Sequence, residues 1–130
     1  MYQNENCLYQ SKYGELHIEY LYTVETNVTF FVFVRSYGFT GEYNFCIHHE
    51  QIRDSILSLK LLDNSFEGLC NLADIDSNAY ICLEFENKEL KVYGQLGGDY
   101  EENYMKFGFL ADQTLVKLLM DKLSEALNNN

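Results

Sequence analysis

One short segment combines three glycines with three acids: Gly94, Gly97, Gly98, Asp99, Glu101 and Glu102. A phosphate-binding loop has its glycines between a strand and a helix, so that the helix N-terminus faces the anion. Here the glycines lead into carboxylates and then into an alternating apolar run that is typical of a strand. Carboxylates would also repel a phosphate. We therefore interpret Gly97-Gly98 as the start of a long hairpin loop.

The three acids of this segment could act in proton transfer or hold a metal ion. A general acid needs a carboxyl group in apolar surroundings, and the only apolar neighbour of Asp99, Glu101 and Glu102 is Tyr100. A calcium loop needs regularly spaced ligands and a closing glutamate, and that spacing is absent. The sequence therefore predicts a solvated acidic loop. We expect no metal ion, no cofactor and no catalytic residue in this protein.

A cysteine and two histidines lie close together at Cys46, His48 and His49. A Cys–His pair can form a nucleophile, but adjacency along a strand is weak evidence for one, and we predict that a histidine at this strand-to-helix junction caps the helix. His17 stands alone in a predicted strand. The cysteines are scattered without a Cys-x-x-Cys pair, which predicts reduced thiols and no zinc site: Cys7, Cys46, Cys70 and Cys82.

The elements that position these residues follow from the hydrophobic pattern. Alternation of apolar and polar residues predicts strands over about 14–47 and again over about 67–111. Apolar residues with helical spacing predict helices over about 50–62 and about 113–127. The order strands–helix–strands–helix predicts an α+β fold. We expect a single domain, 1–130, with a curved antiparallel β-sheet of about six or seven strands and two helices.

Turn and cap signals sharpen this prediction. Asn87-Lys88 between two predicted strands indicates a tight hairpin. Asp112 is a suitable N-cap for the last helix. Each helix has a stripe of apolar residues that should face the sheet: Ile52, Ile56 and Leu59 in the first, and Val116, Leu119, Met120, Leu123 and Leu127 in the second.

The strand pattern between residues 79 and 111 also predicts an outward surface. If Ile81, Val92 and Phe107 point inward, alternate residues must point outward. Tyrosines are then exposed among carboxylates. This pattern fits a protein interface, where tyrosine offers a large contact area, and it equally fits the ordinary solvated face of an antiparallel sheet, in which tyrosine is a good strand former. Together with the acidic loop they form the predicted partner-binding residues: Tyr80, Glu84, Glu86, Tyr93, Asp99, Glu101, Glu102 and Tyr104.

The charge of the chain narrows the kind of partner. Twenty acidic residues outnumber nine basic ones, which gives a net charge of −11 and a pI near 4.5. Such a field repels nucleic acid and anionic membranes and attracts basic proteins. No apolar stretch is long enough to span a bilayer, and the first residues lack the features of a signal peptide. We therefore expect a cytoplasmic protein that binds neither nucleic acid nor membrane.

Several stretches of the chain resemble the WapI-type immunity proteins, small bacterial proteins encoded beside secreted or contact-delivered toxins. The similarity runs from about Thr29 to Leu127 and is most specific at F-G-F-x-A-D-Q-T-L, from Phe107 to Leu115. Other parts of it are "TFFVFVRSYGFTGEYNFCI", "LSLKLL", "FEGLCNLADID" and "LKVYGQLGG". The resemblance implies an antidote without catalytic residues that binds a toxin domain, often a nuclease.

These observations together predict an immunity protein that is not an enzyme. Its partner would be a cognate toxin domain with a basic surface, which an acidic protein can cover, and we favour a monomer. The alternative is a small acidic secretion chaperone, which dimerisation would favour. A third possibility is a small enzyme that uses Cys46, His48 and His49, and turnover of a nucleotide or an ester would favour it.

Overall fold

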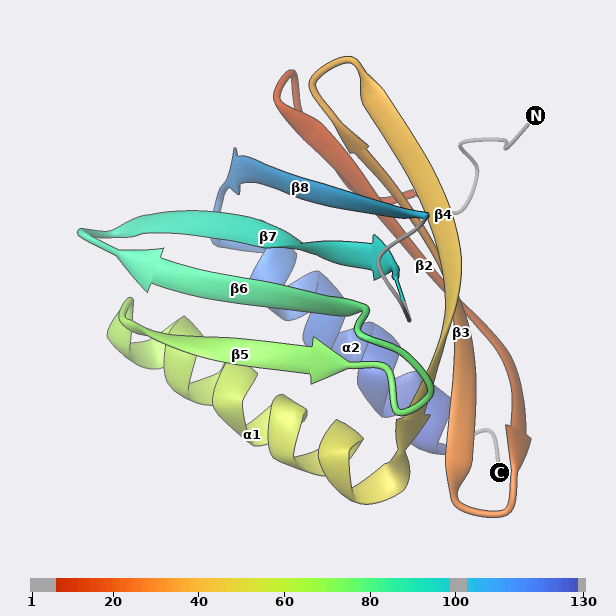
Figure 1. The fold of residues 1–130 in the computed structure, drawn as a ribbon. Helices are drawn as coiled ribbons and strands as arrows, with labels where there is room; N and C mark the ends of the chain where they lie inside the picture. The colour runs from red at the N-terminus through yellow and green to blue at the C-terminus, as the bar shows by residue number, and fades with distance from the viewer. Residues whose placement is uncertain (1–6, 99–102, 129–130) are drawn as a thin grey trace.

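The computed structural model describes residues 7–98 and 103–128, and these residues form eight strands and two helices (Figure 1). The elements follow one another as β1 (Cys7–Gln10), β2 (Gly14–Val24), β3 (Asn27–Ser36), β4 (Phe39–His48), α1 (His49–Ser65), β5 (Gly68–Ala73), β6 (Tyr80–Glu86), β7 (Glu89–Gly97), β8 (Tyr104–Ala111) and α2 (Thr114–Asn128). The predicted α+β class and the order strands–helix–strands–helix are therefore confirmed.

The strands form two sheets, and the prediction of one curved sheet of six or seven strands was wrong. The first sheet has the order β1-β2-β3-β4 and the second the order β5-β6-β7-β8, and all neighbouring strands are antiparallel. The loop after β5 occupies part of the free edge of β4. There the Cys46 N–H donates to the Asp74 carboxylate at 2.8 Å, and the Ile75 N–H donates to the Cys46 carbonyl at 3.0 Å.

Alternation alone could not reveal this division, because it shows which residues share a face and not which strands pair. The short strand β1 was also missed, since its four residues lie in a polar segment. The Asn87-Lys88 hairpin is confirmed. Both residues have positive φ, 54° and 67°, and the flanking Glu86 and Glu89 are paired. Two successive positive φ values are typical of the tight turn that matches strand twist.

Helix α1 begins and ends with recognisable caps. At its start the His48 Nδ1 accepts the Glu50 N–H at 3.1 Å, which confirms the predicted capping role of a junction histidine. At its end Phe66 has a left-handed φ of 56° and donates its N–H to the Leu62 carbonyl at 3.1 Å. The helix is therefore longer than the predicted 50–62, because the left-handed cap and not the turn-forming Asp63-Asn64 terminates it.

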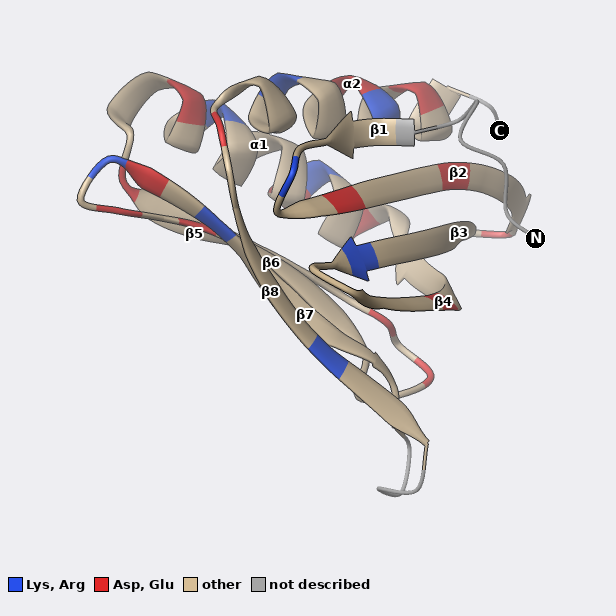
Figure 2. Cartoon of the chain, turned by 90° about the horizontal axis from the view of Figure 1, so that it is seen from above, with Lys and Arg blue, Asp and Glu red and all other residues tan. Residues whose placement is uncertain are grey.

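The two helices lie side by side behind the second sheet and close to β1 and β2 (Figures 1 and 2). Asp112 caps α2 as predicted, since its carboxylate accepts the Thr114 N–H at 2.9 Å. The hydrophobic core is one contiguous cluster to which both sheets and both helices contribute. Its largest fully buried side chains are Phe30, Phe45, Leu16, Ile52, Leu59, Leu62, Ile81, Leu83, Leu90, Leu115, Leu119 and Leu123.

Candidate functional site

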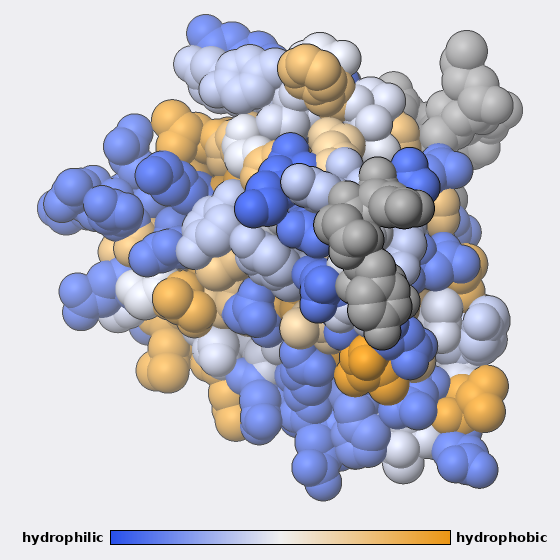
Figure 3. All heavy atoms as spheres, in the orientation of Figure 1, coloured by the Kyte–Doolittle hydropathy of each residue, from blue (hydrophilic) through white to orange (hydrophobic). Residues whose placement is uncertain are grey.

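The second sheet has one face against the core, and neither α1 nor α2 lies on its other face. Its inward residues agree with the predicted alternation, because all of them are buried or pack against the core: Ala79, Ile81, Leu83, Phe85, Leu90, Val92, Met105, Phe107 and Phe109. We call the opposite side of β6, β7 and β8 the outer face. Figure 3 looks onto this side of the molecule and shows hydrophilic and hydrophobic residues intermixed.

The strand register arranges the outer face in rows. One row contains Cys82, Tyr93 and Gly108, and the next contains Glu84, Lys91 and Leu110. Cross-strand neighbours of this kind lie close enough for their side chains to interact. Two predicted partner-binding residues, Glu84 and Tyr93, therefore come together in the middle of the sheet.

The other predicted residues are distributed along the same face or lie outside the described residues. Tyr80 is half-buried in a separate row opposite Gln95. Glu86 is exposed at the β6–β7 turn, and Tyr104 is exposed at the far end of β8. The loop acids Asp99, Glu101 and Glu102 lie outside the described residues.

A groove of about 460 Å³ crosses the outer face. It runs between the second sheet and the β3–β4 turn of the first sheet, and its lining includes Tyr37, Glu84, Lys91, Tyr93, Gly108 and Leu110. A Cβ placed on Gly108 would lie 3.6 Å from the Tyr93 Cβ and 3.8 Å from the Val92 carbonyl oxygen, which are ordinary contacts. A larger residue would therefore fit the backbone here, and the absence of a side chain leaves the groove open.

Tyr93 and Glu84 form the polar side of the groove. The Tyr93 hydroxyl donates to the Glu84 carboxylate at 2.8 Å. The neighbouring Cys82 thiol and the Glu84 carboxylate both raise the pKa of Tyr93, so its hydroxyl stays a donor across the physiological pH range. Burial raises the pKa of Cys82 despite its hydrogen bond with Tyr93. That thiol is thus not activated as a nucleophile.

Tyr37 forms the opposite side and has an unusual backbone conformation. Its φ is 58°, a left-handed value that costs a residue other than glycine about 1–2 kcal/mol. Two hydrogen bonds hold it: its N–H donates to the Tyr13 carbonyl at 3.0 Å, and its carbonyl accepts from Arg35 Nη1 at 3.0 Å. The Tyr13 and Tyr37 rings pack edge to face, with their centroids 6.3 Å apart. Tyr37 nevertheless remains 58% exposed.

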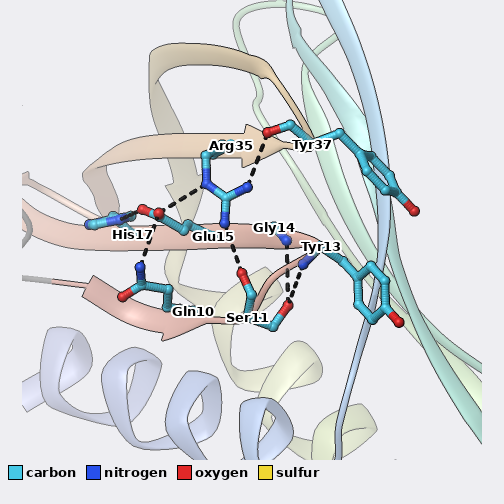
Figure 4. A network of polar contacts seen from close by, with 8 residues as sticks. All are labelled: Gln10, Ser11, Tyr13, Gly14, Glu15, His17, Arg35 and Tyr37. Atoms are coloured by element: carbon cyan, nitrogen blue, oxygen red, sulfur yellow. Dashed lines mark hydrogen bonds and ion pairs between the residues drawn. The ribbon is translucent and has the colours of Figure 1, made fainter.

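A polar network in the first sheet supports this turn (Figure 4). Arg35 donates through Nε to the Glu15 carboxylate at 2.9 Å and through Nη2 to the Ser11 carbonyl at 2.8 Å. The other Glu15 oxygen lies 3.0 Å from the Nε2 of His17, which is fully buried. Because Arg35 also holds the Tyr37 carbonyl, the network connects β1, β2 and β3 to the side of the groove.

The electrostatics of Glu15 reflect this network. Burial by itself raises the pKa of Glu15, but hydrogen bonds from His17 and Arg35, together with their charges, outweigh burial and lower it. Glu15 is therefore an ionised acid with its partners inside the chain.

The Cys46 and His48 pair does not form a nucleophilic site in the described structure. The imidazole of His48 caps α1. Burial is the main reason that the pKa of Cys46 is raised, and the carboxylates of Asp76 and Asp74 add to it. Nucleophilic cysteines have lowered pKa values instead. Within residues 7–98 and 103–128, no group of three or more His, Cys, Asp or Glu side chains is placed to share a metal ion.

The acidic residues of the described ranges are spread over the molecule, and these residues do not gather on the outer face (Figure 2). Asp74, for example, is buried and accepts from Ser77 Oγ at 2.6 Å. Asp63 accepts from the Gln113 side chain at 2.9 Å. In the described part of the outer face, carboxylates and lysines are nearly balanced: Glu84, Glu86 and Glu89 against Lys91 and Lys106. None of the described helices is long and apolar enough to cross a membrane.

The chain matches no protein-family model, and no curated protein and no solved structure matches it. The site must therefore be interpreted from its own geometry.

Of the groove residues, Glu84 and Tyr93 were among the predicted partner-binding residues, whereas Tyr37, Lys91, Gly108 and Leu110 were not. Tyr37 belongs to a turn of the first sheet, 56 positions before its groove neighbour Tyr93, and no local pattern connects them. Leu110 carries no distinctive signal in the sequence, since a single outward leucine at the end of a strand is common. Gly38 and Gly41 indicate a turn in the sequence, but the turn is tighter and Gly41 already belongs to β4. Only the packing of the two sheets brings that turn to the groove.

Proposed function

We propose that this protein is a binding protein that neutralises a basic partner protein, and that the partner is a toxin domain. The second sheet carries the contact through its outer face, with the groove between Tyr93 and Tyr37 at the centre. The proposal includes a cytoplasmic location, no catalytic activity and a monomer in the free state.

The observation that carries this proposal is the open groove between the exposed Tyr37 and the half-buried Tyr93. It lies on a sheet face that none of the described helices covers. A partner side chain that enters such a groove is removed from water and can supply a large share of the binding energy. The net charge of −11 adds attraction to a basic protein and speeds its approach. The resemblance of the sequence to immunity proteins supports the toxin as partner.

The direct test is co-expression with the protein encoded next to this chain. If that protein arrests growth, this chain should restore growth, and Tyr93→Ala should lose much of the protection at equal expression. The matched control is Tyr22→Ala, an exposed tyrosine at the far end of β2. Growth restored equally by wild type and Tyr93→Ala would refute the role of the outer face, and no protection by wild type would refute the antidote function.

Binding kinetics separate the contributions of charge and aromatic contact. Replacing Asp99, Glu101 and Glu102 with amides should slow association and reduce its salt dependence, because these charges are expected at the rim. Replacing Tyr93 or Tyr104 with alanine should speed dissociation about tenfold, as expected for a hot spot that contributes about 1.4 kcal/mol. Surface plasmon resonance at two salt concentrations measures both effects.

A further inference from the structure

We infer that the groove between Tyr37 and Tyr93 is a binding site for an arginine side chain of the partner. This inference rests on the proposed function, because the arginine belongs to the protein that the outer face contacts. It adds the chemical class of the group that enters the groove and the residue that recognises its charge.

The first argument is the Glu84 carboxylate. A carboxylate can accept up to about four hydrogen bonds, and one Glu84 oxygen accepts the Tyr93 hydroxyl at 2.8 Å. Within the described residues no ion pair joins Glu84 to Lys91, its cross-strand neighbour. Glu84 therefore keeps acceptor capacity toward the groove. An apolar side chain that covered it would remove water without replacing those hydrogen bonds, which is unfavourable.

The second argument is the pair of tyrosines. Tyr37 and Tyr93 come from different sheets and both line the groove. Gly108 stands beside Tyr93 in the register, and its carbonyl accepts from Ser36 Oγ, next to Tyr37, at 2.8 Å. The glycine thus lies between the two aromatic residues and leaves room there. A guanidinium is planar, stacks on aromatic rings and is weakly hydrated, whereas a lysine ammonium is compact and strongly hydrated.

The third argument is the balance of charges around the groove. Glu84 and Lys91 are the charged residues in its lining. The positive charge of Lys91 weakens the binding of a cation in the groove, but its side chain is exposed and can extend into solvent. Removal of Glu84 and removal of Lys91 should therefore have opposite effects on arginine binding. This difference in sign is specific, since an apolar occupant would respond little to either change.

The site can be tested without the partner protein by NMR titration of the labelled full chain with a blocked Gly-Arg-Gly peptide. The amides of Tyr93, Gly108 and Leu110 should shift and saturate, and a blocked Gly-norleucine-Gly peptide should not reproduce this. Glu84→Gln should weaken binding of the arginine peptide about tenfold, the scale of one charge-assisted hydrogen bond. Lys91→Gln should tighten it several-fold. The charge-matched control is Glu125→Gln, an exposed residue on α2, which should bind the peptide like wild type.

A variant at the turn completes the test. Tyr37→Asn removes the ring but suits the left-handed backbone, since asparagine tolerates that conformation better than most residues. The variant should fold normally and should bind the arginine peptide severalfold more weakly. Equal shifts with both peptides, no saturable shift, or equal affinities of Glu84→Gln and Glu125→Gln would overturn the inference. If the peptide binds but co-expression gives no protection, the proposed function fails and the arginine site stands. If co-expression gives protection but the arginine peptide does not bind, the antidote function stands and the arginine site is refuted.

Discussion

The two sheets of this protein each place a glutamate beside hydrogen-bond donors, but the two sites differ in what surrounds them. In the first sheet, the Glu15 side chain is buried, with 8% of the residue exposed, and its carboxylate is hydrogen-bonded to Arg35 and His17. In the second sheet, Glu84 is half-buried, accepts a hydrogen bond from the Tyr93 hydroxyl and borders an open groove. The first carboxylate has a guanidinium and an imidazole as partners within the chain, whereas the second has the neutral Tyr93 hydroxyl as its donor.

The same residue types satisfy one another within the fold in the first sheet. In the second sheet they border the open groove at which we propose that the partner binds. The Glu15–Arg35 pair also fixes the left-handed Tyr37, so the first site supports one side of the second. If this comparison holds, changes in the first sheet should reduce the free energy of unfolding. Changes at Glu84 and Tyr93 should affect binding much more than stability.

The largest expected effect is the loss of the ion pair in the first sheet. Arg35→Met leaves Glu15 largely buried without its guanidinium partner, and breaking a buried pair typically costs about 3–5 kcal/mol. We expect about 3 kcal/mol, because Arg35 retains some exposure and solvent weakens the pair. Glu84→Gln should change the free energy of unfolding by less than about 1 kcal/mol. Chemical denaturation measures both, and equal losses would invalidate the comparison.

Two glycines of the second sheet should respond in opposite ways to alanine. A Cβ on Gly94 would clash with the Tyr80 carbonyl oxygen, a backbone atom that cannot move aside cheaply. Overpacking of this kind costs about 1–3 kcal/mol. Gly108→Ala meets only ordinary contacts and should leave stability unchanged or slightly higher, by up to about 1 kcal/mol. Thermal unfolding of the two variants measures this difference. Equal melting temperatures of Gly94→Ala and Gly108→Ala would contradict it.

Acid sensitivity should come more from Glu15 than from an exposed glutamate. The pKa of Glu15 in the folded chain is lowered below its ordinary value of 4.5. Its contribution to stability is therefore complete above that value and is lost as the pH falls through the lower, folded pKa. Glu15→Gln should flatten the decline of stability between about pH 5 and pH 3. Glu42→Gln, at an exposed position of β4, is the control and should decline like wild type.

The smallest effect concerns the ionisation of Tyr93. Cys82 and Glu84 raise the pKa of its hydroxyl, so this tyrosine should remain protonated above about pH 10, where a tyrosine in a model peptide ionises. An ultraviolet titration of Tyr93→Phe should lose amplitude only at the alkaline end relative to wild type. Glu84→Gln should shift the ionisation of Tyr93 to lower pH, because the carboxylate that raises the pKa of the Tyr93 hydroxyl is then absent. Loss of early amplitude in Tyr93→Phe would mean that the hydrogen bond to Glu84 does not form.

Much of the local structure follows from the sequence alone. The alternation over residues 79–111 predicted which side chains of β6, β7 and β8 face the core, since side chains of a strand alternate between its two faces. The turn at Asn87-Lys88 and the caps at His48 and Asp112 were also predictable, because each depends on residues within a few positions of one another.

Only the tertiary structure decided how these elements combine. The division into two sheets depends on which strand edges meet, and short-range periodicity carries no information about that. The outer face was predicted from alternation, but the groove needs Tyr37, and the Glu15–Arg35 network that fixes Tyr37 joins residues 20 positions apart. Hydrophobic burial drives the two sheets together without regard to sequence separation, and that packing, not any local motif, creates the space between Tyr37 and Tyr93.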